Sequence, residues 1–242
     1  LKFLRKKLNL KNYTLFFHND PLSMDGSKTI QDRIFLLNIC YKIIFNSNWS
    51  KKRFLESLDN KYVNSEKLLV CFQSAKLGDL KSIKKKKRWI TFVGKLNRAK
   101  GYDIFAKAII SILNKKKNWK AKIVGDEKRE KIYIKHNNVD LLGFQKHSEV
   151  LKLYKESSIA VVCSRWEEPF GRTSLEAAAN GCAVIISNRG GLPETVTNAI
   201  ILNKLNFKEL KKNIIDLIEN SEKRLLLQNL SIKNLIIDSY KI

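Results

Sequence analysis

The chain has 242 residues, of which 44% are hydrophobic and 10% aromatic. This composition supports a packed core and excludes an intrinsically disordered chain. The longest apolar runs, such as residues 159–163 and 182–186, are much shorter than the roughly 18 residues of a membrane-spanning helix. They are typical of buried strands.

The formal net charge is +24, from 47 Lys and Arg against 23 Asp and Glu. Such a surface favours polyanionic partners, which are nucleic acids, anionic lipids or phosphorylated ligands. The chain is also rich in Lys, Ile and Asn together, as A+T-biased coding would produce. The charge alone therefore does not select a partner.

The four cysteines are far apart and form neither a CxxC pair nor a Cys/His cluster of the kind that binds zinc. Cys163 and Cys182 lie in strand-like runs, so we expect buried free thiols and a reducing, cytoplasmic compartment. No signal-peptide pattern is present. Because the sequence begins at Leu1 rather than Met, we expect a fragment of a longer protein.

Apolar, β-branched runs alternate with amphipathic helical runs, which predicts an α/β protein with parallel strands. The first strands are expected at 12–18, 41–47 and 67–72. The helices between them are expected at 28–39 and 49–58, the second with Ser50 as its N-cap.

The polar segment 73–87 is weakly periodic and ends in a lysine run, which is typical of an interdomain linker. We place the linker at 76–87, between a first domain at 1–75 and a second at 88–205. The lysines are interpreted as solvated, with contact to an anionic membrane surface as the alternative.

A second regular series follows the linker. Strands are expected at 89–95, 119–125, 138–144, 158–164, 182–187 and 199–202. Helices are expected at 102–113, at 148–157 with Ser148 as N-cap, and at 173–180, and a short charged helix is expected directly after Gly125. Two further helices, at about 207–218 and 222–239, are expected to form a C-terminal helical segment at 206–242.

Glycines follow several of these strands, namely Gly94, Gly125, Gly143 and the pair Gly190–Gly191. Open parallel sheets bind ligands at the carboxyl ends of their strands, beside helix N-termini. The glycines therefore outline one rim of a predicted cleft. No P-loop and no GxGxxG fingerprint is present.

Three stretches occur in a characteristic order: FVGKLNRAKG (92–101), LLGF (141–144) and SRWEEPFGRTSLEAAANGCAVIISNRGGLPE (164–194). In order and spacing they resemble the C-terminal, donor-binding domain of the retaining GT-B glycosyltransferases called group 1, or family 4. The resemblance covers residues 88–205 well and extends more loosely to 12–72. It implies a Rossmann-like parallel sheet domain of GT-B type and a truncated second α/β domain, which is the residual end of an N-terminal, acceptor-side domain.

The resemblance also implies how a sugar-nucleotide donor is bound. Lys95 and Lys100 neutralise its pyrophosphate, and Lys95 stands where the family often has Arg, which keeps the charge but loses the bidentate geometry. Glu176 accepts hydrogen bonds from the ribose hydroxyls. A capping box formed by Thr173 and Glu176 is the open alternative for this carboxylate.

Further donor contacts are implied around the two glycine-containing motifs. Phe170, Gly171 and Arg172 precede a helix whose N-terminus suits a phosphate or sugar oxygen. Arg172 stands where the family often has an apolar residue, so it either faces the acceptor or adds charge near the pyrophosphate. Gly143 and Phe144 border the base, with simple packing of Phe144 as the alternative. The same resemblance places Gly94 beside the donor.

Two residues are expected at the reacting sugar. The resemblance implies that Glu168 contacts the transferring sugar and stabilises charge at its anomeric carbon, and that His18 lies on the N-terminal side of the cleft. His136 and His147 lie in charged, surface-like segments and are assigned no role. The GGLPE motif at 190–194 is expected to form a tight turn.

The resemblance thus implies a retaining hexosyltransferase that moves a sugar from a UDP-, GDP- or ADP-linked donor to a glycan or lipid-linked acceptor. We expect it to act in cell-envelope polysaccharide biosynthesis, in the cytoplasm or peripherally on the inner membrane face. No metal or other cofactor is expected, because an Asp-x-Asp motif is absent. A non-catalytic nucleotide-sugar-binding remnant remains an alternative, as does a basic nucleic-acid-binding protein, although no specific nucleic-acid motif is present.

Overall fold

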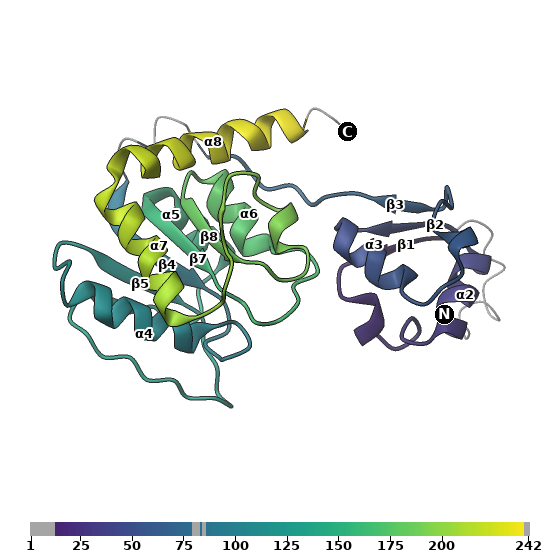
Figure 1. The fold of residues 1–242 in the computed structure, drawn as a ribbon, viewed down its shortest axis with the longest axis horizontal. Coiled ribbons are helices and arrows are strands. Elements are labelled where there is room, and N and C mark those ends of the chain that lie inside the picture. The colour runs from purple at the N-terminus through teal and green to yellow at the C-terminus, as the bar shows by residue number, and fades with distance from the viewer. Residues whose placement is uncertain (1–12, 79–82, 84–85, 240–242) are drawn as a thin grey trace. The chain divides into compact units, whose positions relative to one another are not determined.

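The computed structural model describes residues 13–78, 83 and 86–239, with side chains in the last helix up to Asn234. The described chain splits into two compact units (Figure 1). The first contains residues up to Gln73 together with Glu168–Phe170, and the second contains the remainder. Each unit has its own sheet, and every strand pair in both sheets is parallel. The predicted α/β class is therefore confirmed.

The first unit has a three-stranded sheet in the order β1-β2-β3. Its elements are β1 (Tyr13–Phe17), α2 (Ile30–Ile39), β2 (Cys40–Phe45), α3 (Asn48–Leu55) and β3 (Leu68–Val70), with 3-10 turns at Pro21–Ser23 and Asn60–Tyr62. Phe17, Phe45 and Phe54 pack against one another in its core, with ring centroids 5.3–5.5 Å apart.

The start of α3 differs from the prediction. Ser47, not Ser50, is the N-cap, because the Ser50 backbone N–H donates to Ser47 Oγ at 3.0 Å. Ser50 lies within the first turn, and its hydroxyl donates to Asn46 Oδ1. Serine is a favoured N-cap residue, so the sequence alone allows either Ser47 or Ser50. Ser47 is the cap because its backbone is still extended and the helix begins at Asn48.

The second unit has a six-stranded sheet in the order β6-β5-β4-β7-β8-β9. Its strands are β4 (Lys87–Val93), β5 (Lys120–Val124), β6 (Val139–Leu141), β7 (Ser157–Val162), β8 (Ala183–Ser187) and β9 (Ile200–Leu202). All six predicted strands form. The strand order reverses between β4 and β7, and such a switch point in a parallel sheet is where ligands bind.

Helices cover both faces of this sheet: α4 (Tyr102–Leu113), α5 (His147–Glu156), α6 (Arg172–Ala179), α7 (Phe207–Glu219) and α8 (Ser221–Ser239). Along β8, Ala183 and Ile185 pack with α4 and α7, whereas Val184 and Ile186 pack with α5 and α6. This burial on both faces explains why the strand sequences are continuously apolar. In the described part of the chain, no helix is both long and apolar enough to cross a bilayer.

The predicted short helix after Gly125 is wrong, because residues 126–138 form an extended loop without helix. The Glu127 carboxylate accepts hydrogen bonds from the Arg129 side chain and backbone and from Asn97 Nδ2. The hydrogen bonds from Arg129 lower the pKa of Glu127 to about 2. Glu127 thus bonds both within this loop and to Asn97 in the loop after β4. Ser148 is also not an N-cap, since α5 begins at His147 after Lys146.

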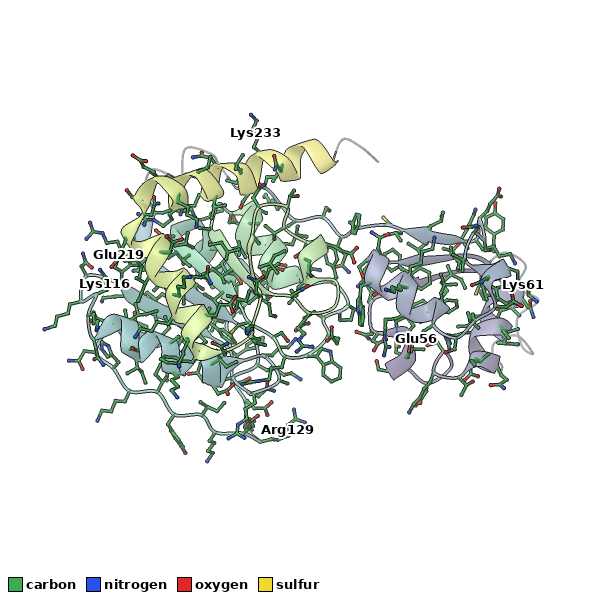
Figure 2. The ribbon with its side chains drawn as sticks, viewed as in Figure 1. Glu56, Lys61, Lys116, Arg129, Glu219 and Lys233 are labelled. Carbon is green, nitrogen blue, oxygen red and sulfur yellow. The ribbon has the colours of Figure 1, made fainter. Side chains whose placement is uncertain are left out.

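Cys163 and Cys182 are buried free thiols, as predicted. Burial raises the pKa of Cys163 to about 12, which leaves it protonated and unreactive. In the core cluster that contains Cys163, α4 and α7 pack through buried aliphatic side chains. Their ends are also joined by an ion pair between Lys116 Nζ and Glu219 Oε1 at 2.7 Å (Figure 2).

Lys86, in the lysine run of the predicted linker, is not solvated. Its Nζ donates to the carbonyls of Tyr154 (2.9 Å), Lys155 (3.1 Å) and Asn180 (2.8 Å). These carbonyls lie at the carboxyl ends of α5 and α6, where helices leave acceptors unpaired and a cation is favourable. Burial lowers the pKa of Lys86. This one lysine therefore fastens two helix ends, and its interpretation as a solvated residue is wrong.

We predict that Lys86→Met destabilises the second unit by about 1–3 kcal/mol, because three carbonyls at the ends of α5 and α6 lose a charged donor. The measurement is the midpoint of urea unfolding, followed by circular dichroism. Lys87→Met is the matched control, since the Lys87 ammonium forms a half-exposed ion pair with Glu156 and lies 4.4 Å from the centroid of the Trp89 ring, and it should change stability by less than about 1 kcal/mol. Equal losses in the two variants would contradict the assigned role of Lys86.

Candidate functional site

The carboxyl ends of β4, β5 and β6 carry three of the predicted glycines, and the structure brings these together. The Gly94 N–H donates to the Val124 carbonyl at 3.0 Å, and the Gly125 N–H donates to the Gly143 carbonyl at 2.8 Å. A β-carbon on Gly125 would lie 1.9 Å from the Gly94 oxygen, and its φ is +130°. Only glycine fits this position, so the backbone itself forms the edge here.

The loop between β4 and α4 carries Lys95, which is exposed, and Lys100, which is half-buried. Asn97 shapes this loop. Its Oδ1 accepts from the Lys100 N–H at 3.0 Å, and its carbonyl accepts from the Tyr102 N–H at 3.1 Å. Sequence reasoning missed Asn97, although an asparagine that bonds to nearby backbone is a common turn-forming residue.

The loop between β7 and α6 binds directly to this lysine-bearing loop. Ser164 Oγ, the Arg165 N–H and the Trp166 N–H all donate to the Ala99 carbonyl, at 3.2, 2.8 and 3.1 Å. The Arg165 guanidinium also forms a bidentate ion pair with Asp103, at 2.6 and 2.8 Å. Two fixed hydrogen bonds of this kind are strong and geometrically specific. The loops after β4 and β7 are therefore held together.

The Arg165–Asp103 pair changes the titration of both groups. Burial alone would raise the pKa of Asp103, but the hydrogen bonds and positive charge of Arg165 outweigh it and lower that pKa. The hydrogen bonds that Arg165 donates to Asp103 in turn raise the pKa of Arg165. The folded state therefore favours the ionised carboxylate.

Glu167 connects a third loop, which follows β8. Its Oε1 lies 2.9 Å from Arg189 Nη1, and its Oε2 accepts from the Gly190 N–H at 2.6 Å. The predicted turn at GGLPE forms, with Gly190 at φ +57° and a 3-10 helix at Leu192–Glu194. Sequence reasoning missed Glu167, because the family resemblance assigned a role to Glu168 alone and nothing in the local sequence indicates the partners of Glu167.

Helix α6 begins directly after this junction at Gly171, whose φ is +115°. A β-carbon at Gly171 would lie 2.4 Å from Leu192 Cδ2 and 2.9 Å from Ser174 Oγ. Within the preceding loop, Glu168 is half-buried and Phe170 is buried. The N–H groups in the first turn of a helix have no partners within the helix, and they attract anions.

Glu176 lies one turn further along α6, and only 8% of its side chain is exposed. Its Oε1 accepts hydrogen bonds from Arg172 Nη2 at 3.0 Å and from His147 Nε2 at 3.0 Å. The capping-box alternative is wrong, because Gly171 is the N-cap and Thr173 is the second residue of the helix. His147, to which the sequence assigned no role, is a direct partner of this carboxylate.

Two exposed aromatic side chains lie in loops that follow strands of the same sheet. Phe144 is 78% exposed and Trp166 is 53% exposed. The alternative that Phe144 serves only for packing is therefore wrong.

His18 belongs to the first unit, directly after β1. Its ring stacks on Phe16 at 4.5 Å between centroids, and its Nδ1 lies 3.0 Å from Gln73 Nε2. The carbonyl of His18 accepts from Asn46 Nδ2 at 3.0 Å. Its predicted role at the reacting sugar stays a prediction.

Among the residues with described placement, no three His, Cys, Asp or Glu side chains gather in a way that could hold a metal ion. The expectation that no metal is required stays a prediction. Lys95 and Lys100 lie in the loop after β4, and the first turn of α6 adds the positive end of a helix dipole.

Solved structures share this architecture. Anabaena Alr3699/HepE in complex with UDP superposes with a TM-score of 0.76 at 20% identity, covering 93% of this chain and 67% of that one. Sucrose-phosphate synthase from Thermosynechococcus elongatus gives 0.75 at 17% identity, covering 98% and 65%. At this identity the likeness shows the fold alone, which is the predicted GT-B type.

A sequence model of the family "Glycosyl transferases group 1" matches residues 79–232, more than half of the chain. The chain therefore belongs to this family. It is 32% identical over 155 residues to spore coat protein SA of Bacillus subtilis, covering 57% of this chain and 41% of that protein. It is 35% identical over 142 residues to the uncharacterized glycosyltransferase MJ1178 of Methanocaldococcus jannaschii, covering 55% and 39%. The chain thus spans about two fifths of the length of these curated relatives.

The Arg165–Asp103 pair predicts a pH dependence of stability. Because folding lowers the pKa of Asp103, its contribution is present above the ordinary aspartate pKa of about 3.9 and is lost as the pH falls through the lowered value. Asp103→Asn should therefore flatten the fall in melting temperature between about pH 5 and pH 3. Asp126→Asn, which alters an exposed carboxylate of the same unit, should leave the wild-type slope. Identical slopes for wild type and Asp103→Asn would contradict the pairing.

Proposed function

We propose that the chain binds a nucleotide sugar at the carboxyl edge of the six-stranded sheet and takes part in transferring its sugar to a glycan or lipid-linked acceptor. The observation that carries this proposal is the buried Glu176 carboxylate, fixed on α6 one turn after Gly171. A single acceptor group held in this way suits a ligand with adjacent hydroxyl donors. The ribose of a nucleotide is such a ligand.

The surroundings of Glu176 suit the rest of a sugar nucleotide. Its diphosphate requires positive charge, which Lys95, Lys100 and the first turn of α6 supply. The glycine edge at Gly94 and Gly143 allows close backbone approach, and the exposed ring of Phe144 offers an apolar surface for the base. Each chemical part of the donor thus has a matching group.

Two relatives support this choice of ligand. The solved structures of Anabaena HepE contain UDP or UDP-glucose. The lipopolysaccharide core biosynthesis mannosyltransferase LpsB of Rhizobium meliloti is 27% identical to this chain over 121 residues. A UDP-, GDP- or ADP-linked hexose and an acceptor of the cell envelope are accordingly part of the proposal.

The transfer step needs stabilisation of the diphosphate as it leaves the anomeric carbon. Cationic groups fixed beforehand supply this stabilisation without reorganising during the reaction. Glu168 and His18 are the residues proposed to contact the transferred sugar, which keeps its anomeric configuration. The net charge of +24 suits a site on the inner face of an anionic membrane.

The test is calorimetric titration of the chain with UDP-, GDP- and ADP-glucose. At least one donor should bind, and Glu176→Gln should weaken it about 10- to 100-fold, because the neutral amide loses a charge-assisted hydrogen bond. Lys100→Met should weaken the same donor about tenfold through loss of positive charge. Lys115→Met, an exposed lysine after α4, is the control and should bind as the wild type does.

The outcomes separate the alternatives. Binding with release of free glucose or its transfer to an acceptor supports the transferase, and binding without either favours a non-catalytic nucleotide-sugar module. If none of the three donors binds, the proposed function is wrong. A salt-sensitive gel shift with DNA or RNA in that case would favour the nucleic-acid alternative.

A further inference from the structure

The Glu176 carboxylate is held by donors from two different helices. Arg172 lies four residues earlier on α6, and its Nη2 and Nε lie 3.0 and 3.3 Å from Glu176 Oε1. His147 is the first residue of α5, and its Nε2 lies 3.0 Å from the same oxygen. Because an ionised carboxylate can only accept, this contact places the proton on Nε2.

The position of Arg172 is not explained by the stability of its helix. It is the first residue of α6, where the helix dipole disfavours a cation. Within a helix, the more favourable order for an i,i+4 pair places the acidic residue first, and here the arginine precedes the glutamate. The 62% exposed side chain nevertheless extends to a buried oxygen.

The two carboxylate oxygens of Glu176 differ in their hydrogen bonds. Among the described residues, every side-chain hydrogen bond to this carboxylate ends on Oε1. Oε2 therefore keeps its lone pairs for donors that a ligand brings. The fixed side chain has already lost its rotamer freedom, so binding does not incur that entropy cost again.

Arg172 also changes the charge at this point. A carboxylate near a diphosphate would repel it, because like charges a few ångströms apart interact appreciably near a protein surface. The guanidinium at 3.0 Å from Oε1 offsets that repulsion. The same residue thus orients the carboxylate and screens it.

We propose that Arg172 and His147 are positioning residues that hold Glu176 Oε1 and so present Oε2 to the two ribose hydroxyls of the nucleotide. The proposal rests on the proposed function. It assigns Arg172 to the glutamate rather than to the pyrophosphate or the acceptor, and it gives His147 a role in recognising the sugar of the nucleotide.

The experiment compares UDP, GDP and ADP with their 2′,3′-dideoxy analogues by calorimetry on the full chain, using whichever nucleotide binds. The ratio of the two dissociation constants measures recognition of the ribose hydroxyls. In the wild type this ratio should be about 10 to 100, as for hydrogen bonds to a charged acceptor. Arg172→Leu and His147→Ala should each reduce it about fivefold or more, because an unfixed carboxylate recovers its rotamer freedom.

Conservative variants and a matched control make the result specific. Arg172→Lys keeps the charge, and His147→Gln can place an amide donor near the Nε2 position, so both ratios should lie closer to the wild type than those of the truncated variants. Lys152→Leu breaks an i,i+3 pair with Glu149 on α5 and should leave the ratio unchanged.

Three results would overturn the proposal in distinguishable ways. If Arg172→Leu weakens the nucleotide and its dideoxy analogue equally, Arg172 contacts the phosphates and does not position Glu176. If His147→Ala leaves the ratio at its wild-type value, the histidine plays no part in ribose recognition. If neither nucleotide nor analogue binds the wild type at all, the proposed function fails and the inference fails with it.

Discussion

The arrangement of the candidate site depends on one bidentate ion pair, between Arg165 in the loop after β7 and Asp103 in the first turn of α4. This pair closes a junction in which three donors meet the Ala99 carbonyl. Glu167 then extends the junction to the loop after β8 through Arg189 and Gly190. Hydrogen bonds and ion pairs thereby join the loops after β4, β7 and β8. The first of these loops carries Lys100, and the second is followed by α6.

Although the chain has a large excess of positive charge, three acidic residues at this edge have specific partners. Asp103, Glu167 and Glu176 each meet an arginine, rather than one of the far more numerous lysines. A guanidinium can make parallel hydrogen bonds in a fixed plane, whereas an ammonium acts as a point charge. The arginines therefore set geometry at this edge, and the exposed lysines mainly supply positive potential.

The sequence predicts the sheet and its helices because burial imposes a period on the chain, and this period is local. All six strands of the second unit follow from apolar runs, and α4 matches its predicted bounds. The glycines at the strand ends are predictable for the same reason, since a sharp turn requires glycine at one particular position of the sequence. Glu176 follows from the motif at 164–194, which is one continuous stretch of the sequence.

The contacts that organise the site could not be found in this way. His147 is 29 residues from Glu176, Glu167 is 22 from Arg189, and Lys86 is 94 from Asn180. Each pairing depends on how neighbouring elements stack in three dimensions, and a lysine or histidine in a charged segment carries no local sign of its partner. The choice between Ser47 and Ser50 shows the same limit at short range, because both hydroxyls suit a helix start.

Strand β8 has a consequence for how relatives with this fold can diverge. All five of its residues are buried, and the last of them, Ser187, donates through Oγ to the Ser164 carbonyl at 2.7 Å. A change in β8 would therefore disturb both helical layers at once, and it would also disturb the junction of loops. We therefore expect that relatives acquire new substrates through insertions and substitutions in the loops, because the sheet determines only where each loop begins.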